Sequence, residues 1–159
     1  MTVTPSSNPP LAIVVDASIA VAIAAREVTE PKASAEVNRY LASGAEFFAP
    51  GVLVAETLYV LCGKLEEEKT LSPADHATAV QAFHNLMGFI SSPPDGEISL
   101  VLRAEAIRGS YTCRRSADGL YIALAEALTR TRPTVLLTLD ADMPKQAAKN
   151  APTVTVQLL

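Results

Sequence analysis

The feature that most constrains the fold is an apolar run, Leu11 to Val15, that ends abruptly at an acid, Asp16. Such a run offers no polar side to solvent, which is typical of a short strand buried on both faces of a parallel sheet. A second apolar run, Val135 to Leu139, ends in the same way at Asp140. Because parallel strands are joined by helical crossovers, the two runs predict an α/β domain.

The segments around these runs fit that architecture. Helices are predicted over residues 17–26, 31–43, 51–65, 73–90, 101–108, 116–128 and 141–149, and further strands over residues 46–49, 98–100 and 154–158. Ser72 and Asp75 form a capping box, and Ser116 is expected to cap its helix. With no repeat and no interdomain linker, residues 11–159 are predicted to form one domain, a parallel sheet of four or five strands flanked by helices. Residues 1–10 are predicted to be a disordered lead-in.

Composition excludes several classes of protein. Hydrophobic residues make up 49% of the 159 residues and charged residues 19%, which rules out an intrinsically disordered chain. A net charge of −4 and the scarcity of aromatic residues argue against binding nucleic acid by bulk electrostatics or by base stacking. No convincing targeting or membrane-spanning segment is found, and Cys62 and Cys113 lack metal-finger spacing. We therefore expect a soluble cytoplasmic protein.

Four acids stand where a carboxylate is costly or well placed for chemistry. Asp16 and Asp140 follow buried strands, at the carboxyl ends where parallel α/β sheets place their ligand sites. Glu56 stands in an apolar helix, where an unpaired ionised carboxylate is strongly unfavourable. Asp118 lies in the first turn of the helix that follows Ser116. We expect these four acids to converge on one crevice.

Four carboxylates packed together repel one another unless cations neutralise them. Their hard oxygen atoms favour Mg²⁺ or Mn²⁺, and no histidine or cysteine is placed to supply a softer donor. Two such ions suit in-line hydrolysis of a phosphodiester, one activating water and the other stabilising the leaving oxygen. Ser18 and Thr138 are candidates for orienting the carboxylates.

Each candidate also has an ordinary structural interpretation, which the sequence leaves open. Asp16 suits the N-cap of the following helix, and Glu56 can extend to solvent from a helix edge. The helix dipole favours a negative charge at Asp118. Of Asp140 and Asp142, one is expected to cap the last helix, and Asp140 is favoured for the site. The two hydroxyl side chains also suit the ends of a helix and a strand.

Four short motifs follow one another in a fixed order along residues 11–158: Val15-Asp16-Ala-Ser18, Ala49-Pro50…Ala55-Glu56…Leu61, Ala117-Asp118-Gly-Leu-Tyr121-Ile-Ala-Leu-Ala125 and Leu137-Thr138-Leu-Asp140. In this order and spacing they resemble the PIN-domain nucleases, in particular the VapC-like toxins of prokaryotic toxin–antitoxin pairs. Two details depart from the family pattern. Thr57 and Tyr59 flank a stretch where an Asn is common, and Gly119 replaces the more usual small helix former.

The resemblance implies a Rossmann-like fold and RNA cleavage that depends on Mg²⁺ or Mn²⁺. It implies that the catalytic and metal-binding acids are Asp16, Glu56, Asp118 and Asp140, with Asp142 as an auxiliary acid. The hydroxyls of Ser18 and Thr138 match common polar positions beside those acids. The resemblance also implies a homodimer and a small antitoxin protein that blocks the site, often with a basic side chain.

Arginines are concentrated just before the third acid. Arg114 and Arg115 are candidates for a rim that guides RNA phosphates, because the guanidinium fork matches phosphate oxygens. Ordinary surface arginines or dimer contacts are the alternative. If the rim exists, replacing both residues by Ala weakens RNA binding and flattens its salt dependence.

Two other functions compete with the nuclease. One is a catalytically silent PIN-like domain kept for binding a partner. The other is a receiver-like signalling domain, which needs a mid-chain Asp at a strand end and a late Lys after a strand. Here the middle acid is the helical Glu56, and Lys145 lies inside a helix after Pro144.

Overall fold

The computed structural model describes residues 8–109 and 113–159, apart from the side chain of Arg114. The predicted disordered lead-in falls mainly on residues 1–7, which lie outside the described residues. The described elements, in chain order, are β1 (Ala12–Val15), α1 (Ala17–Ala24), α2 (Glu30–Ala42), β2 (Glu46–Phe48), α3 (Val52–Glu66), α4 (Pro73–Met87), β3 (Ile90–Ser91), a 3₁₀ turn (Glu97–Leu100), α5 (Val101–Arg108), a second 3₁₀ turn (Cys113–Arg115), α6 (Ser116–Thr129), β4 (Thr134–Thr138), α7 (Met143–Asn150) and β5 (Thr155–Leu158).

The sheet is parallel throughout, with five strands in the order β3-β2-β1-β4-β5. β1 is central and pairs with β4 in a register that sets Val15 opposite Leu137. The next backbone N–H, that of Asp16, donates to the carbonyl oxygen of Leu137 at 3.1 Å. The predicted fold class is therefore confirmed, and the carboxyl ends of the two acid-bearing strands lie side by side.

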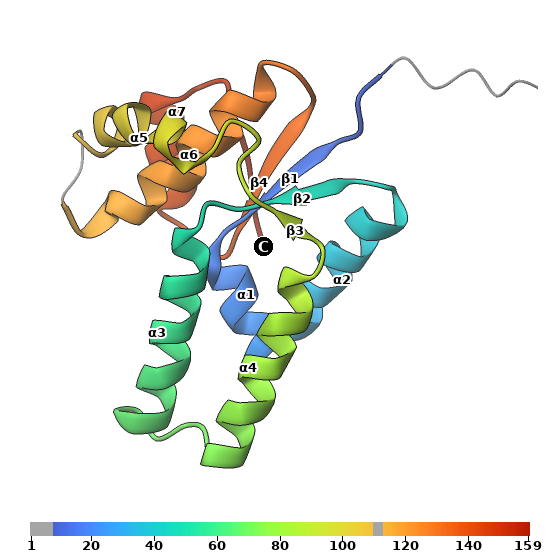
Figure 1. Cartoon of the computed structure of the whole chain (residues 1–159), viewed down its shortest axis with the longest axis vertical. Helices are drawn as coiled ribbons and strands as arrows, with labels where there is room; N and C mark the ends of the chain where they lie inside the picture. The colour runs from blue at the N-terminus through green and yellow to red at the C-terminus, as the bar shows by residue number, and fades with distance from the viewer. Residues whose placement is uncertain (1–7, 110–112) are drawn as a thin grey trace, which may run out of the picture.

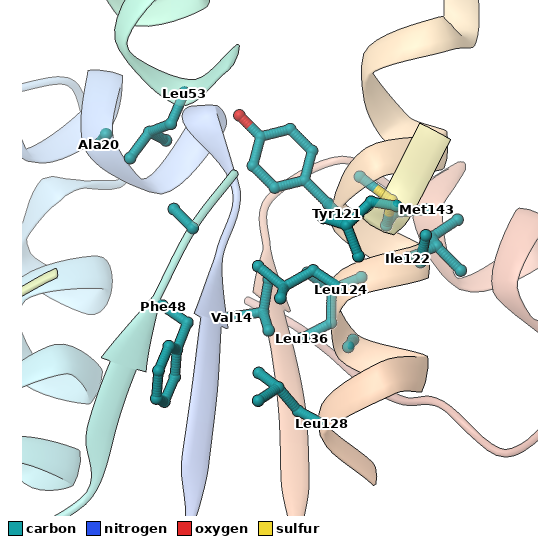
Figure 2. Close-up of a cluster of buried hydrophobic side chains, with 14 of the residues drawn as sticks. Val14, Ala20, Phe48, Leu53, Tyr121, Ile122, Leu124, Leu128, Leu136 and Met143 are labelled. Carbon is teal, nitrogen blue, oxygen red and sulfur yellow. The ribbon is translucent and has the colours of Figure 1, made fainter. Parts of the chain in front are cut away.

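The two faces of the sheet are covered by different helices. Alternate residues of β1 point to opposite faces, as the pleat requires, so that Val14 packs on the α6 side and Val15 on the α2 side. Figure 2 shows Val14 and Leu136 packed beside Leu124 and Leu128 of α6. α3 and α4 form a pair of long helices that extends away from the sheet (Figure 1). Both faces are thus apolar, and polar side chains gather where the strands end.

Three local predictions were wrong. Residues 98–100 form a 3₁₀ turn instead of a strand, with Ile98 89% exposed, because β3 at Ile90–Ser91 takes the edge of the sheet. The helix before it ends at Met87, where Gly88 follows, and does not reach Ile90. Ser116 is the first residue of α6 and not its N-cap, since its hydroxyl donates to the carbonyl oxygen of Cys113 at 2.7 Å.

The capping box at the start of α4 is confirmed. The Ser72 hydroxyl oxygen accepts a hydrogen bond from the backbone N–H of Asp75 at 3.1 Å and donates to the Asp75 carboxylate at 2.6 Å. Within the residues that the structure describes, no helix combines the length and the apolar character needed to span a bilayer.

Candidate active site

One pocket gathers the four acids singled out in the sequence. It has a volume of about 460 Å³ and lies at the carboxyl ends of β1 and β4, where its wall includes Asp16, Glu56, Asp118 and Asp140. These residues come from the end of β1, from α3, from α6 and from the end of β4, so folding brings together acids up to 124 positions apart. Asp142 is not among the residues that line this pocket.

Asp16 is the most deeply buried of the acids, with 6% of its surface exposed. Its Oδ2 atom accepts hydrogen bonds from the Ser18 backbone N–H (3.4 Å), the Ser18 hydroxyl (2.5 Å) and the Thr138 hydroxyl (2.8 Å). Burial raises the pKa of Asp16 above its ordinary value, and the two hydroxyl donors partly offset that rise. Asp16 therefore caps α1, as one sequence interpretation predicts, and it also faces the pocket.

Ser18 and Thr138 tie the ends of the two central strands to each other. Each hydroxyl donates to Asp16 and accepts one backbone N–H, that of Leu139 at Ser18 (2.9 Å) and that of Asp140 at Thr138 (2.9 Å). The arrangement uses both the donor and the acceptor capacity of each hydroxyl. The two side chains thus fix the carboxylate of Asp16 against the strand that leads to Asp140.

Glu56 turns toward the pocket and not away to solvent. Its Oε2 atom accepts a 2.7 Å hydrogen bond from the hydroxyl of Tyr121, which is fully buried on α6. Figure 2 shows the Tyr121 ring among the apolar side chains, with its hydroxyl at the edge of the cluster. Burial raises the pKa of Glu56, and the nearby carboxylates of Asp16 and Asp118 raise it further. The acids therefore influence one another electrostatically across the pocket.

Asp118 is half-buried in the first turn of α6. Its Oδ2 atom accepts hydrogen bonds from the Gln146 side-chain amide at 2.6 Å and from Arg115 at 3.3 Å. Burial raises the pKa of Asp118, and both hydrogen-bond donors oppose that rise. The two donors thus partly offset the cost of placing a carboxylate in this position.

Asp140 combines the two expected roles of helix capping and pocket lining, and Asp142 lies outside the pocket. Asp140 accepts the backbone N–H of Asp142 through Oδ1 (2.8 Å) and takes an ion pair from Arg115 through Oδ2 (2.8 Å). It therefore stabilises the start of α7 and also lines the pocket. The Asp142 side chain is 45% exposed and pairs with Arg115 (2.6 Å) and Lys145 (2.8 Å). The hydrogen bond from Lys145, above all, lowers the pKa of Asp142.

Arg115 points its guanidinium in among the acids. It forms ion pairs with Asp118, Asp140 and Asp142, at 3.3, 2.8 and 2.6 Å, and its side chain is 33% exposed. The sequence placed Arg115 on a rim facing substrate, whereas in the structure it supplies positive charge to the carboxylates. The side chain of Arg114, the other candidate, lies outside the described residues.

The carboxylates of the pocket are the right chemical type to bind a hard divalent cation, but their side chains do not converge on a single point. Across residues 8–109 and 113–159, no three acidic, histidine or cysteine side chains stand close enough to hold a metal ion as they are arranged. The carboxylate oxygens are nonetheless the ligand type that Mg²⁺ and Mn²⁺ take. The raised pKa values of Asp16, Glu56 and Asp118 show burial and mutual repulsion that a cation would relieve.

The sequence reasoning missed several residues of the site. Glu27 and Thr29 also line the pocket, and Glu27 pairs with Lys64 at 2.7 Å. Tyr121 belongs to the third motif, but the spacing of that motif does not reveal the contact of its hydroxyl to Glu56. Gln146 had one usable signal, because it is the polar member of the otherwise apolar face of α7.

Comparison with known protein families places the fold and this pocket in one family. The model of the PIN domain family matches residues 13–149. The chain belongs to the PIN domain family. That assignment confirms the resemblance drawn from the four motifs and removes the receiver-like alternative. PIN domains are generally metal-dependent nucleases.

A solved structure gives the same answer for the fold. It is the crystal structure of VapBC2 from Rickettsia felis bound to a DNA fragment from its promoter. The match covers 92% of this chain and 98% of the matched chain, with a TM-score of 0.55 and 12% sequence identity. At that identity the likeness establishes the fold. No curated protein matches the chain in sequence.

Proposed function

We propose that this PIN-domain protein is a Mg²⁺- or Mn²⁺-dependent endoribonuclease and the toxin of a type II toxin–antitoxin pair. The observation that carries the proposal is the convergence of Asp16, Glu56, Asp118 and Asp140 on one pocket at the carboxyl end of a parallel sheet. Parallel α/β proteins bind ligands at this edge, and carboxylates there are the donors that divalent-ion phosphodiester chemistry requires.

The chain's own part in the reaction is to hold negative oxygen atoms in place. We assign the metal to Asp16, Glu56, Asp118 and Asp140, with Asp142 as an auxiliary ligand at the rim. When bound, the divalent ion activates the attacking water and stabilises the leaving oxygen. Ser18 and Thr138 keep the Asp16 carboxylate in one orientation, and the Tyr121 hydroxyl does the same for Glu56. Such outer hydrogen bonds fix ligand geometry before substrate arrives.

RNA binding must rest on local contacts, because the chain carries a net charge of −4. We assign phosphate contacts to Arg115, whose one-third-exposed side chain pairs with Asp118 and Asp140 of the pocket wall, and to Arg114. Replacing both by Ala is expected to weaken RNA binding and flatten its salt dependence. Unchanged binding by the double variant, measured by fluorescence anisotropy at two salt concentrations, would remove these contacts from the proposal.

The proposed partners are an antitoxin protein and a second copy of the chain. Two acids of the pocket wall, Asp118 and Asp140, already pair with Arg115, so the pocket suits a basic side chain of an antitoxin, and the similar structure is of a VapBC complex. The family resemblance implies a homodimer, and large apolar side chains that face solvent, among them Tyr59, Ile98 and Leu102, are available to such an interface. The two cysteines are free, which agrees with action in the reducing cytoplasm.

The test is cleavage of a mixed pool of single-stranded RNA by the purified protein. Two reactions contain the RNA with Mg²⁺ or with Mn²⁺, and a third contains the RNA with EDTA. A fourth contains single-stranded DNA in place of RNA, with the same divalent ions. The proposal predicts fragments in the first two reactions alone. Cleavage that persists in EDTA would contradict metal dependence, and cleavage of DNA in preference to RNA would contradict the substrate class.

One observation favours a second candidate, a PIN domain that is catalytically silent and binds a partner. Arg115 forms ion pairs with Asp118 and Asp140, and the acidic side chains that the structure describes are not arranged as a metal site. Calorimetry with Mn²⁺ separates the two candidates. A nuclease binds the ion and loses binding on Asp16→Asn, whereas a silent domain shows no binding in either protein.

A further inference from the structure

A buried amide side chain stands behind one of the four acids. Gln146 on α7 has no exposed surface, and its neighbours on the same helix face are the buried, apolar Met143 and Ala147. Burying an amide is unfavourable unless hydrogen bonds replace the lost water. The Nε2 atom of Gln146 donates to Oδ2 of Asp118 at 2.6 Å, so the side chain serves that carboxylate.

The oxygen atom of the Gln146 amide lacks a hydrogen-bond partner in the part of the chain that the structure describes, which indicates that the contact to Asp118 determines how the side chain is placed. The Oε1 atom of Gln146 is buried and has no hydrogen-bond partner among the described residues. Turning the amide over would set Oε1 against a carboxylate oxygen, and the repulsion fixes Nε2 as the atom that faces Asp118. An unsatisfied buried acceptor lowers stability, so core packing alone does not account for a glutamine here.

Gln146 also links two of the elements that form the site. Its backbone N–H donates to the carbonyl oxygen of Asp142 at 3.0 Å, at the loop that carries Asp140, while its side chain reaches across to α6. Arg115 donates to the same Oδ2 atom of Asp118, but at 3.3 Å and from a position one-third exposed. The buried amide is therefore the closer and better shielded donor. Both bonds fall on Oδ2, so Oδ1 carries neither of them.

We propose that Gln146 is a positioning residue that holds the Asp118 carboxylate for binding a divalent cation. It acts through Asp118 by fixing Oδ2, so that Oδ1 is presented in one orientation. This inference rests on the proposed function, since it requires that the acids bind metal. Hydrogen bonds of this kind to a metal ligand typically change metal affinity by about ten- to a hundredfold.

The test is calorimetric titration of the full chain with Mn²⁺. Gln146→Met keeps the volume of the side chain and removes the donor, and Gln146→Asn keeps the amide but shortens its reach. The matched control is Gln157→Met, because Gln157 is a partly buried glutamine that bonds Tyr40 and Glu36 instead of the pocket acids. Both Gln146 variants are expected to weaken Mn²⁺ binding by at least about tenfold, with the control within about twofold of wild type.

Thermal unfolding in EDTA is measured on the same proteins. A merely structural role predicts a lower melting temperature with unchanged Mn²⁺ affinity, and that result would overturn the inference. If the wild-type chain binds Mn²⁺ and both Gln146 variants bind it equally well, the positioning role alone fails. If the wild-type chain does not bind Mn²⁺, the metal-dependent function fails and the inference fails with it. Should Gln146→Met not fold, Gln146→Asn decides.

Discussion

Gly119, directly after Asp118, gives a sharp test of how closely α5 and α6 pack. A Cβ atom at this position would lie 2.7 Å from the backbone carbonyl oxygen of Ala104 on α5, closer than such atoms approach in real structures. The obstacle is backbone, so no side-chain rotation relieves it. The departure from the family pattern at Gly119 is thereby explained, because the glycine lets the two helices approach.

The expected effect of Gly119→Ala is the difference between two opposing contributions. Alanine in a helix interior is favoured over glycine by about 1 kcal/mol. Forcing an extra carbon into a packed interface costs about 1–3 kcal/mol. With a backbone obstacle the cost falls in the upper half of that range, so the free energy of unfolding is expected to drop by about 1–2 kcal/mol. In a chain of this size the melting temperature then falls by about 3–6 °C.

Gly63 provides the matched control. It also lies within a helix, α3, but an added Cβ would have no atom within 4 Å. Gly63→Ala is expected to raise stability by about 0.5–1 kcal/mol, because the propensity gain is unopposed. Calorimetric melting of both variants in EDTA checks the pair. A Gly119→Ala protein at least as stable as wild type would refute the close helix contact.

Three further predictions concern the charges of the site. Arg115→Met is expected to lower the free energy of unfolding in EDTA by up to about 1 kcal/mol. Mn²⁺ is expected to stabilise this variant more than the wild type, since the ion replaces the lost positive charge. Equal shifts of the melting temperature with Mn²⁺ in the two proteins would contradict this. Tyr121→Phe removes the donor to Glu56 and is expected to lower the urea-unfolding free energy by about 1–3 kcal/mol, while Tyr59→Phe, at an exposed position, leaves it unchanged. Burial raises the pKa of Asp16, so without metal its ionisation opposes folding, and stability is lost as pH rises from the ordinary Asp pKa through the raised one. Asp16→Asn is therefore expected to be more stable than wild type in EDTA at pH 7, with the gap closing below about pH 4; a gap independent of pH would rule out this origin.

The residues that the sequence revealed are those whose local context was abnormal. Asp16 and Asp140 follow the buried strands, at the edge where parallel sheets bind ligands, and Glu56 is an acid in an apolar helix. Local context also identified the capping box at Ser72, because both its donor and its acceptor lie within one turn.

What the sequence could not predict depends on contacts between distant segments. β3 has two residues and is a strand only because β2 lies beside it, so Ile90 was assigned to a helix. The ion pairs of Arg115 join the 3₁₀ turn before α6 to the loop after β4, and the Gln146 amide joins α7 to α6. Such contacts leave no periodic pattern in the sequence, since each joins segments that meet only in the folded chain.

The central claim is that the four acids form a metal-dependent nuclease site, and paired amide variants test it most directly. Asp16→Asn and Asp75→Asn remove the same charge, but Asp75 lies at the start of α4, outside the pocket. The measurement is the rate of cleavage of single-stranded RNA in Mn²⁺ by the two variants and the wild type. We predict that Asp16→Asn loses more than about a hundredfold in rate, while Asp75→Asn stays at the wild-type rate. Equal rates for all three folded proteins would contradict the claim.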